Sequence, residues 1–161
     1  MSLVIDTLRT SPVTEELSEA EVEILATLFE VQDYQTGDII VQPNDNQPDN
    51  LYILAYGDIE VKIESGGEES TVHVLKPGDL AGMITFAGGA ATHITATLYA
   101  MGPTKVLSMG RARFETLINS HPMLVYRVMR GIIRNMHGIV RRVNIESAEL
   151  SNYIYKTGGR Y

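Results

Sequence analysis

Hydrophobic residues first recur at helical spacing between residues 18 and 30. Ser18 and Glu21 have the spacing of a capping box, and Leu17 with Val22 supplies the flanking hydrophobic staple. This pattern predicts a helix over residues 18–30. Its apolar face consists of Val22, Ile24, Leu25, Leu28 and Phe29.

From Val31 onward the hydrophobic period changes to two. Ile59, Val61 and Ile63 alternate with charged residues, which is typical of a strand with one solvent-exposed face. Gly57-Asp58 is typical of a tight hairpin turn, and glycine-containing turn signals recur about every ten residues. Short strands with such spacing predict an antiparallel β-sandwich or barrel over about residues 31–110. Further strands are expected at residues 37–41, 51–56, 71–75, 93–98 and 105–109.

Helical periodicity returns at residues 111–119 and becomes strong after Pro122, which suits the first turn of a helix. Hydrophobic residues are then spaced 4, 3, 4, 3 and 4 apart, as in the a/d seam of a coiled coil. Two interpretations remain open, a parallel two-helix seam in a homodimer and packing on the chain's own barrel, and we favour the homodimer. The seam positions are Val125, Met129, Ile132, Met136, Ile139 and Val143. A second row that would contact the barrel is Leu124, Val128, Ile133 and Val140.

The net charge of −7 conceals an asymmetry between the two halves. Residues 1–80 hold 17 acidic and three basic residues, whereas residues 81–161 hold three acidic and ten basic residues. The favoured interpretation is that the halves complement each other within the fold or across a dimer; a basic half that attracts an anion is the alternative. For the arginines of the long helix, solvated flanks paired with acidic barrel residues are favoured over a nucleic-acid surface. These are Arg127, Arg130, Arg134, Arg141 and Arg142.

Composition excludes several kinds of chemistry. The 161 residues contain no cysteine, so disulfides, thiolate metal sites and thiol nucleophiles are absent. The four histidines lack metal-ligand spacing, and neither a G-x-S-x-G nor a Walker motif occurs. We therefore expect no catalytic residues, no metal and no enzymatic activity. With no apolar run of about 20 residues and no leader-like N-terminus, we expect one cytoplasmic domain over residues 1–161, without membrane contact.

The order of these elements resembles the cyclic-nucleotide-binding domain, particularly the sensor half of catabolite-activator-type regulators. The resemblance covers about residues 18–145 and implies a double-stranded β-helix (jelly-roll) barrel with an N-terminal helix and a long C-terminal dimerisation helix. The barrel would occupy about residues 31–110 and the C-terminal helices about residues 111–150. The residues that carry the resemblance are 28–29, 37–40, 49–54, Gly57, 74–79, Gly82, Ala96, Phe114 and Pro122.

The resemblance places a ligand in the loop at residues 78–96, where the family pattern is roughly G-D-x-x-G-E followed by R-x-A. Gly82 fits this pattern, but Met83 stands at the glutamate position. Ala90 stands at the arginine position and is followed by Ala91 and Thr92. Both polar anchors of a cyclic nucleotide are therefore replaced, and we do not expect ordinary cAMP or cGMP to bind.

Helix positions that the family turns toward a purine are also apolar here, at Ile139 and Val140. Two interpretations of this altered loop at residues 78–96, called the cassette below, remain open. Either it serves another ligand, apolar or weakly anionic, or side chains such as Met83, Ile84 and Phe86 fill the pocket.

The resemblance implies a regulatory module that senses a small-molecule effector, dimerises and signals to a downstream protein through its C-terminal helix. Residues 144–161 are too few for the helix-turn-helix domain that follows in family regulators, so we expect no direct DNA binding. The alternatives are a ligand-free protein-interaction module and a cupin-type enzyme. The cupin reading requires a histidine cluster on the barrel strands.

Overall fold

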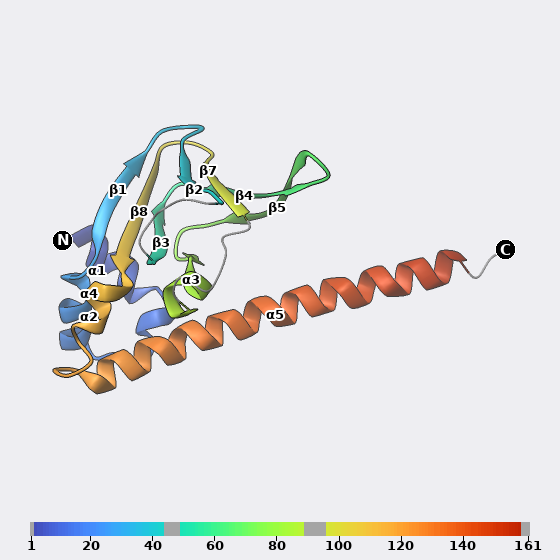
Figure 1. The fold of residues 1–161 in the computed structure, drawn as a ribbon. Coiled ribbons are helices and arrows are strands. Elements are labelled where there is room, and N and C mark those ends of the chain that lie inside the picture. The colour runs from blue at the N-terminus through green and yellow to red at the C-terminus, as the bar shows by residue number, and fades with distance from the viewer. Residues whose placement is uncertain (1, 44–48, 89–95, 159–161) are drawn as a thin grey trace.

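The structure is a β-barrel with helices at one end and a long helix that runs past its other end (Figure 1). This computed structural model describes residues 2–43, 49–88 and 96–158. The helical elements are α1 (Ser2–Arg9), η1 (Pro12–Thr14), α2 (Glu19–Ala26), α3 (Met83–Gly88), α4 (Arg111–Glu115) and α5 (Pro122–Gly158).

The barrel consists of two four-stranded antiparallel sheets, ordered β1-β8-β3-β6 and β2-β7-β4-β5. The fold predicted from the sequence, mainly β with flanking helices and a long C-terminal helix, is confirmed. The strands are β1 (Glu30–Tyr34), β2 (Ile39–Val41), β3 (Asn50–Tyr56), β4 (Ile59–Ser65), β5 (Glu68–Leu75), β6 (Leu80–Ala81), β7 (Ala96–Ala100) and β8 (Thr104–Gly110).

Strand β3 lies between two hydrophobic clusters, which explains its unbroken apolar run. Leu51 and Ile53 belong to the cluster that packs on the helices, called the helical core below. Tyr52 and Leu54 point to the other side and belong to the cluster inside the barrel. Because successive side chains of a strand face opposite sides, a strand buried on both faces must be apolar throughout.

The predicted N-terminal helix is α2, and its capping box is present in full. The Ser18 hydroxyl accepts a hydrogen bond from the Glu21 amide, and the Glu21 carboxylate accepts one from the Ser18 amide. The sequence did not predict α1, an eight-residue helix that buries Val4 and Leu8 in the helical core. Together, α1, η1 and α2 form the surface on which α5 begins.

The first half of α5 packs closely on η1. Leu124 and Val128 are buried there, and a Cβ atom added to Gly131 would lie 2.4 Å from the Pro12 carbonyl oxygen. Only glycine permits this approach of two backbones without displacement.

Arginines on α5 make ion pairs with glutamates of the N-terminal segment. Arg127 lies 3.2 Å from Glu21, and Arg130 lies 3.1 Å from Glu16. Arg134 contacts both Glu15 and Glu16 at 3.3 Å. The interpretation that the acidic and basic halves complement each other within the fold is confirmed for these residues.

Candidate functional site

The exposed hydrophobic face of α5 is displaced by one residue from the predicted seam. Ile132 is 1% exposed and lies in the helical core of its own chain, whereas Ile133 is 63% exposed. The prediction that Ile132 faces a partner is therefore wrong, because η1 and the helical core already cover that face. Val125 also packs against this core.

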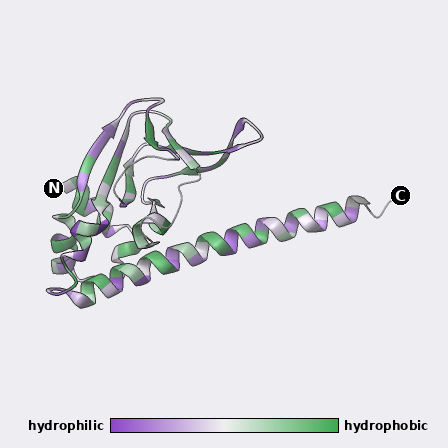
Figure 2. Ribbon diagram, viewed as in Figure 1, coloured by the Kyte–Doolittle hydropathy of each residue, from purple (hydrophilic) through white to green (hydrophobic). Residues whose placement is uncertain are grey.

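A second 3-4 repeat runs along a flank of α5, where Ile133 and Val140 are exposed while Met129 and Met136 also pack partly against the helical core. It shares Met129, Met136 and Val143 with the predicted seam, but takes Ile133 and Val140 in place of Ile132 and Ile139. The repeat continues past residue 143, and Figure 2 shows hydrophobic positions recurring along the part of α5 that lies beyond the barrel. Its members are Tyr126, Met129, Ile133, Met136, Val140, Val143, Ser147, Leu150 and Ile154, called the outer seam below.

The part of the predicted cassette that the structure describes packs largely against the protein. Met83 begins α3 and is partly buried against the helical core, and Phe86 is buried with its ring centroid 5.4 Å from that of Phe114. Ile84 is exposed. Gly82 has a φ of +76°, and a Cβ atom there would lie 2.4 Å from the Asn50 carbonyl oxygen. Ala90, Ala91 and Thr92 lie outside the described residues.

A side-chain contact joins α3 to α5. The Asn135 amide Nδ2 donates a hydrogen bond of 3.3 Å to the Met83 sulfur. Thioether sulfur is a weak acceptor, so the contact holds the two helices together with little energy. A displacement of α3 would nevertheless change this contact with α5 at Asn135.

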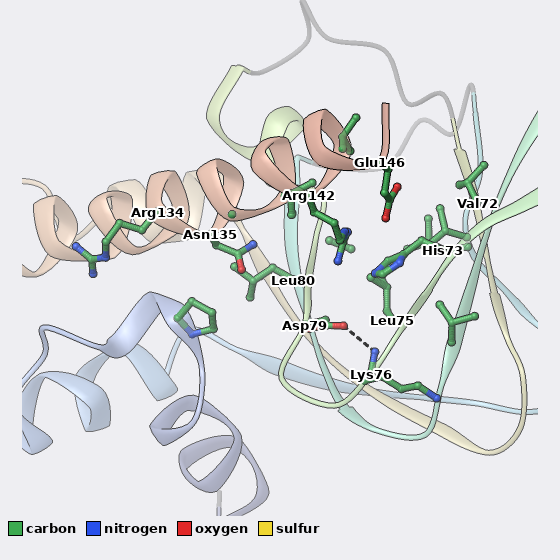
Figure 3. Close-up of a pocket in the computed structure, with 18 of the residues that line it drawn as sticks. Val72, His73, Leu75, Lys76, Asp79, Leu80, Arg134, Asn135, Arg142 and Glu146 are labelled. Atoms are coloured by element: carbon green, nitrogen blue, oxygen red, sulfur yellow. Dashed lines mark hydrogen bonds between the residues drawn. The ribbon is translucent and has the colours of Figure 1, made fainter. Parts of the chain in front are cut away.

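The candidate site is a cavity of about 900 Å³ between the barrel and α5 (Figure 3). One wall is aliphatic and comes from β4, β5, β6 and β7, and the opposite wall is α5. The aliphatic side chains of the barrel wall are Val61, Val72, Val74, Leu75, Leu80 and Leu98.

The α5 wall brings apolar and charged groups together. Ile139 and Val143 line the cavity together with Arg142 and Glu146, and Gly138 lies between Asn135 and Arg142 along the helix. In Figure 3, Arg142 and Glu146 extend from α5 toward the strand that carries His73. The site therefore combines aliphatic side chains with charged and polar groups.

The other charged groups of the lining are largely engaged elsewhere. The Asp79 carboxylate accepts a 2.8 Å hydrogen bond from the Lys76 amide, and Lys76 Nζ lies 2.9 Å from the Asp58 carboxylate. Arg134 is paired with Glu15 and Glu16. Arg142 differs from these groups, because no ion pair joins it to any carboxylate in the described part of the chain.

The structure brings together only some of the residues predicted for the ligand site. Ile139 lines the cavity, but Val140 is 53% exposed on the outer seam, and Gly82, Met83 and Ile84 lie outside the lining. Sequence reasoning missed His73, Asn135, Gly138 and Arg142. The signal it could have used was Gly138, a glycine inside a strongly helical pattern.

The described residues offer neither a metal-binding cluster nor a membrane-spanning helix. Within residues 2–43, 49–88 and 96–158, no three or more histidine or acidic side chains are grouped so as to hold a metal ion. Over the same ranges, no helix combines the length and apolar character needed to cross a membrane.

Comparison with known proteins gives a consistent picture of the fold. A family model described as the cyclic nucleotide-binding domain matches residues 31–121, which is more than half of the chain. The catabolite activator protein of Thermus thermophilus is 25% identical with a TM-score of 0.72, covering 88% of this chain and 63% of that one. A cyclic nucleotide-binding domain from Methylobacillus flagellatus is 16% identical with a TM-score of 0.77, covering 88% and 78%.

A curated relative is the HTH-type transcriptional regulator Cmr of Mycobacterium tuberculosis. It is 25% identical over 128 residues, which is 74% of this chain and 48% of the relative. The chain therefore spans about half the length of the curated relative that it matches.

Proposed function

Because the chain belongs to the cyclic nucleotide-binding domain family, we propose that it is a dimeric sensor whose effector binds between β5 and α5. Family and fold mark it as a regulatory module. The effector would occupy the cavity of about 900 Å³, and the paired α5 helices would carry its effect to a downstream protein.

The observation that carries this proposal is that two adjoining surfaces of α5 have different surroundings. Its barrel face forms one wall of the cavity, through residues that include Asn135, Ile139 and Arg142. The adjoining flank carries the outer seam, with exposed Ile133 and Val140, and Val143 belongs to both surfaces. A strict 3-4 repeat keeps one face toward a partner helix, so any change in how α5 sits on the barrel alters the dimer contact.

Coupling requires the effector to bind one arrangement of barrel and α5 more tightly than another. The cavity supplies that difference because its two walls belong to the two parts that would move. The hydrogen bond between Asn135 and Met83 links the cassette helix to the same stretch of α5. An effector that separates or draws together these walls would shift the balance between the two arrangements.

Sedimentation velocity tests the dimer with matched isoleucines of α5. Ile133 and Ile145 are both at least half exposed, but only Ile133 lies on the outer seam. Wild type is expected at twice the chain mass of 17.8 kDa. Ile133→Asp should give monomer, because the contact would bury two unpaired carboxylates, and Ile145→Asp should remain dimeric.

Ile132→Asp does not provide this test, because Ile132 is a core residue and the variant would unfold the chain itself. A wild type that sediments as monomer at tens of micromolar would overturn the proposed dimer. So would an Ile145→Asp variant that dissociates as completely as Ile133→Asp.

A further inference from the structure

We propose that the cavity binds an aliphatic carboxylate, with the hydrocarbon against the barrel wall and the carboxylate on Arg142. This inference names the ligand class for the proposed sensor and therefore rests on the proposed function. Its basis is the lining of the cavity and the exposed Arg142 within that lining.

The barrel wall of the cavity suits a hydrocarbon chain better than a planar ring. Its side chains are valine and leucine, and the described lining holds neither phenylalanine nor tyrosine to stack on a ring. Branched aliphatic groups offer dispersion contacts without directional preference. An extended or bent alkyl chain can use the whole of such a wall.

Helix α5 also gives the cavity an elongated shape. Lining residues run along it from Arg134 to Glu146, which at 1.5 Å per residue is a length of about 18 Å. A hydrocarbon lying along the helix would contact Ile139 and Val143 on one side and Leu75 and Leu98 on the other. Each methylene group buried in this way would tighten binding about fourfold.

Gly138 provides room along the helix for such a ligand. Nothing lies within 4 Å of the position that its Cβ atom would occupy, so close packing does not require glycine there. Gly131 differs in this respect, because its backbone contacts Pro12. A glycine inside a helix is less favourable than alanine, and at residue 138 its consequence is open space that adjoins the cavity.

Arg142 supplies the group that would recognise a carboxylate. Its guanidinium has no ion-pair partner among the described residues, whereas Arg127, Arg130 and Arg134 on the same helix are all paired. A guanidinium binds a carboxylate through two parallel hydrogen bonds. His73, on β5 across the cavity from α5, adds a ring N–H donor, while Glu146 places a competing negative charge one turn along α5.

Isothermal titration calorimetry with decanoate, decanol and decylamine tests the proposal on the full chain. Decanoate should bind, decanol should bind more weakly and decylamine should not bind detectably. Arg142→Gln should weaken decanoate binding about tenfold or more, as expected for a charge-assisted hydrogen bond, and should leave decanol unchanged. Glu146→Gln should strengthen decanoate binding, because it removes the competing charge.

Two variants control for non-specific binding. Arg141→Gln removes the neighbouring arginine, which lies outside the cavity lining, and should bind decanoate like wild type. Gly138→Leu fills the open space without a backbone clash and should abolish binding while remaining folded. Equal decanoate affinity in Arg142→Gln and wild type would overturn the proposal, and so would binding that survives in Gly138→Leu.

The outcomes separate this inference from the proposed function. If decanol or decylamine binds best and Gly138→Leu abolishes that binding, the cavity is an effector site but the ligand class is wrong. If decanoate binds as predicted to a chain that sediments as monomer, the ligand class holds and the dimeric sensor fails. If none of the three compounds binds wild type at millimolar concentration, the aliphatic carboxylate is rejected, and the dimer is judged by sedimentation alone.

Discussion

The two halves of α5 have similar hydrophobic spacing but opposite surroundings. From Pro122 to Ile139 the helix lies on η1, the helical core and the cavity, and three of its arginines are paired with glutamates. From Val140 to Lys156 every side chain is exposed, including those of Arg142, Val143 and Glu146, which line the open cavity. Hydrophobic periodicity therefore shows that a helix has an apolar face, but the groups opposite that face decide whether it belongs to a core or to an interface.

The two glycines of α5 repeat this contrast on a smaller scale. Gly131 is held by contact with Pro12, and Gly138 adjoins open space at the cavity. In the sequence both are simply glycines inside a helix. Their different roles follow from what lies within a few ångströms of the absent side chain.

The largest expected effect comes from neighbouring isoleucines on opposite faces. Ile132→Ala should lower the free energy of unfolding by about 2–5 kcal/mol, because it opens a cavity in the helical core. Ile133→Ala should leave the stability of the separate chain within about 0.5 kcal/mol and act on the dimer instead. Urea unfolding at low and high protein concentration measures both effects, and equal losses in the two variants would refute the assignment of the faces.

A second pair of variants compares the glycines. Gly131→Ala should destabilise the protein by about 1–3 kcal/mol, because its Cβ would overlap the Pro12 carbonyl oxygen. Gly138→Ala should stabilise it by about 0.5–1 kcal/mol, since alanine has the higher helix propensity and meets no atom within 4 Å. Thermal unfolding gives the sign of each change, and stabilisation by both would mean that α5 is not held closely on η1.

Much of the fold could be predicted because it depends on local patterns. The capping box at Ser18, the alternation in β4 and the turn at Gly57 each specify an element within a few residues. The shift of the seam from Ile132 to Ile133 could not be predicted in this way. Both residues fit a 3-4 repeat, and the choice depends on contacts with η1, more than 100 residues earlier in the chain.

The candidate site was predicted less well than the fold for the same reason. Ile139 was identified through the resemblance, but His73 and Arg142 line one cavity only because β5 and α5 come together in the fold. Arg142 looks like any solvated arginine in the sequence, and Arg130 and Arg134 are indeed surface ion-pair partners. Its distinction is that it lines the cavity without an ion pair in the described structure, which spacing along a helix does not reveal.

Lowering the pH should weaken the contact between the N-terminal segment and the packed half of α5, from Pro122 to Ile139, and leave the exposed half unaffected. The Ser18 amide is the main cause that lowers the pKa of Glu21, aided by Arg127. Desolvation acts to raise the pKa of Glu16, but Arg134 and Arg130 hold it below its ordinary value. Groups with a lowered folded-state pKa stabilise the protein above the unfolded pKa of about 4.3, and this stability is lost as pH falls through the folded value.

The pH effect is measurable as a loss of thermal stability between pH 6 and pH 3. Glu16→Gln should reduce the pH dependence by a few degrees at most, since surface ion pairs contribute little. Glu149→Gln, on the exposed half of α5, is the matched control and should leave the pH dependence unchanged. If Glu149→Gln alters the profile as much as Glu16→Gln, the acid response does not come from the contact with the N-terminal segment.

The smallest expected effect is that of cyclic nucleotides. Met83 stands where the family pattern has a glutamate, and its side chain packs on the core and accepts a hydrogen bond from Asn135. The ribose hydroxyl would therefore find a thioether, a far weaker acceptor than a carboxylate. We expect millimolar cAMP or cGMP to leave the unfolding temperature unchanged, whereas a ligand at 100 times its Kd stabilises by about 2.7 kcal/mol. Calorimetric binding of cAMP at low micromolar Kd would show that residues on the barrel side suffice as anchors. The prediction that the cassette no longer binds cyclic nucleotides would then be wrong.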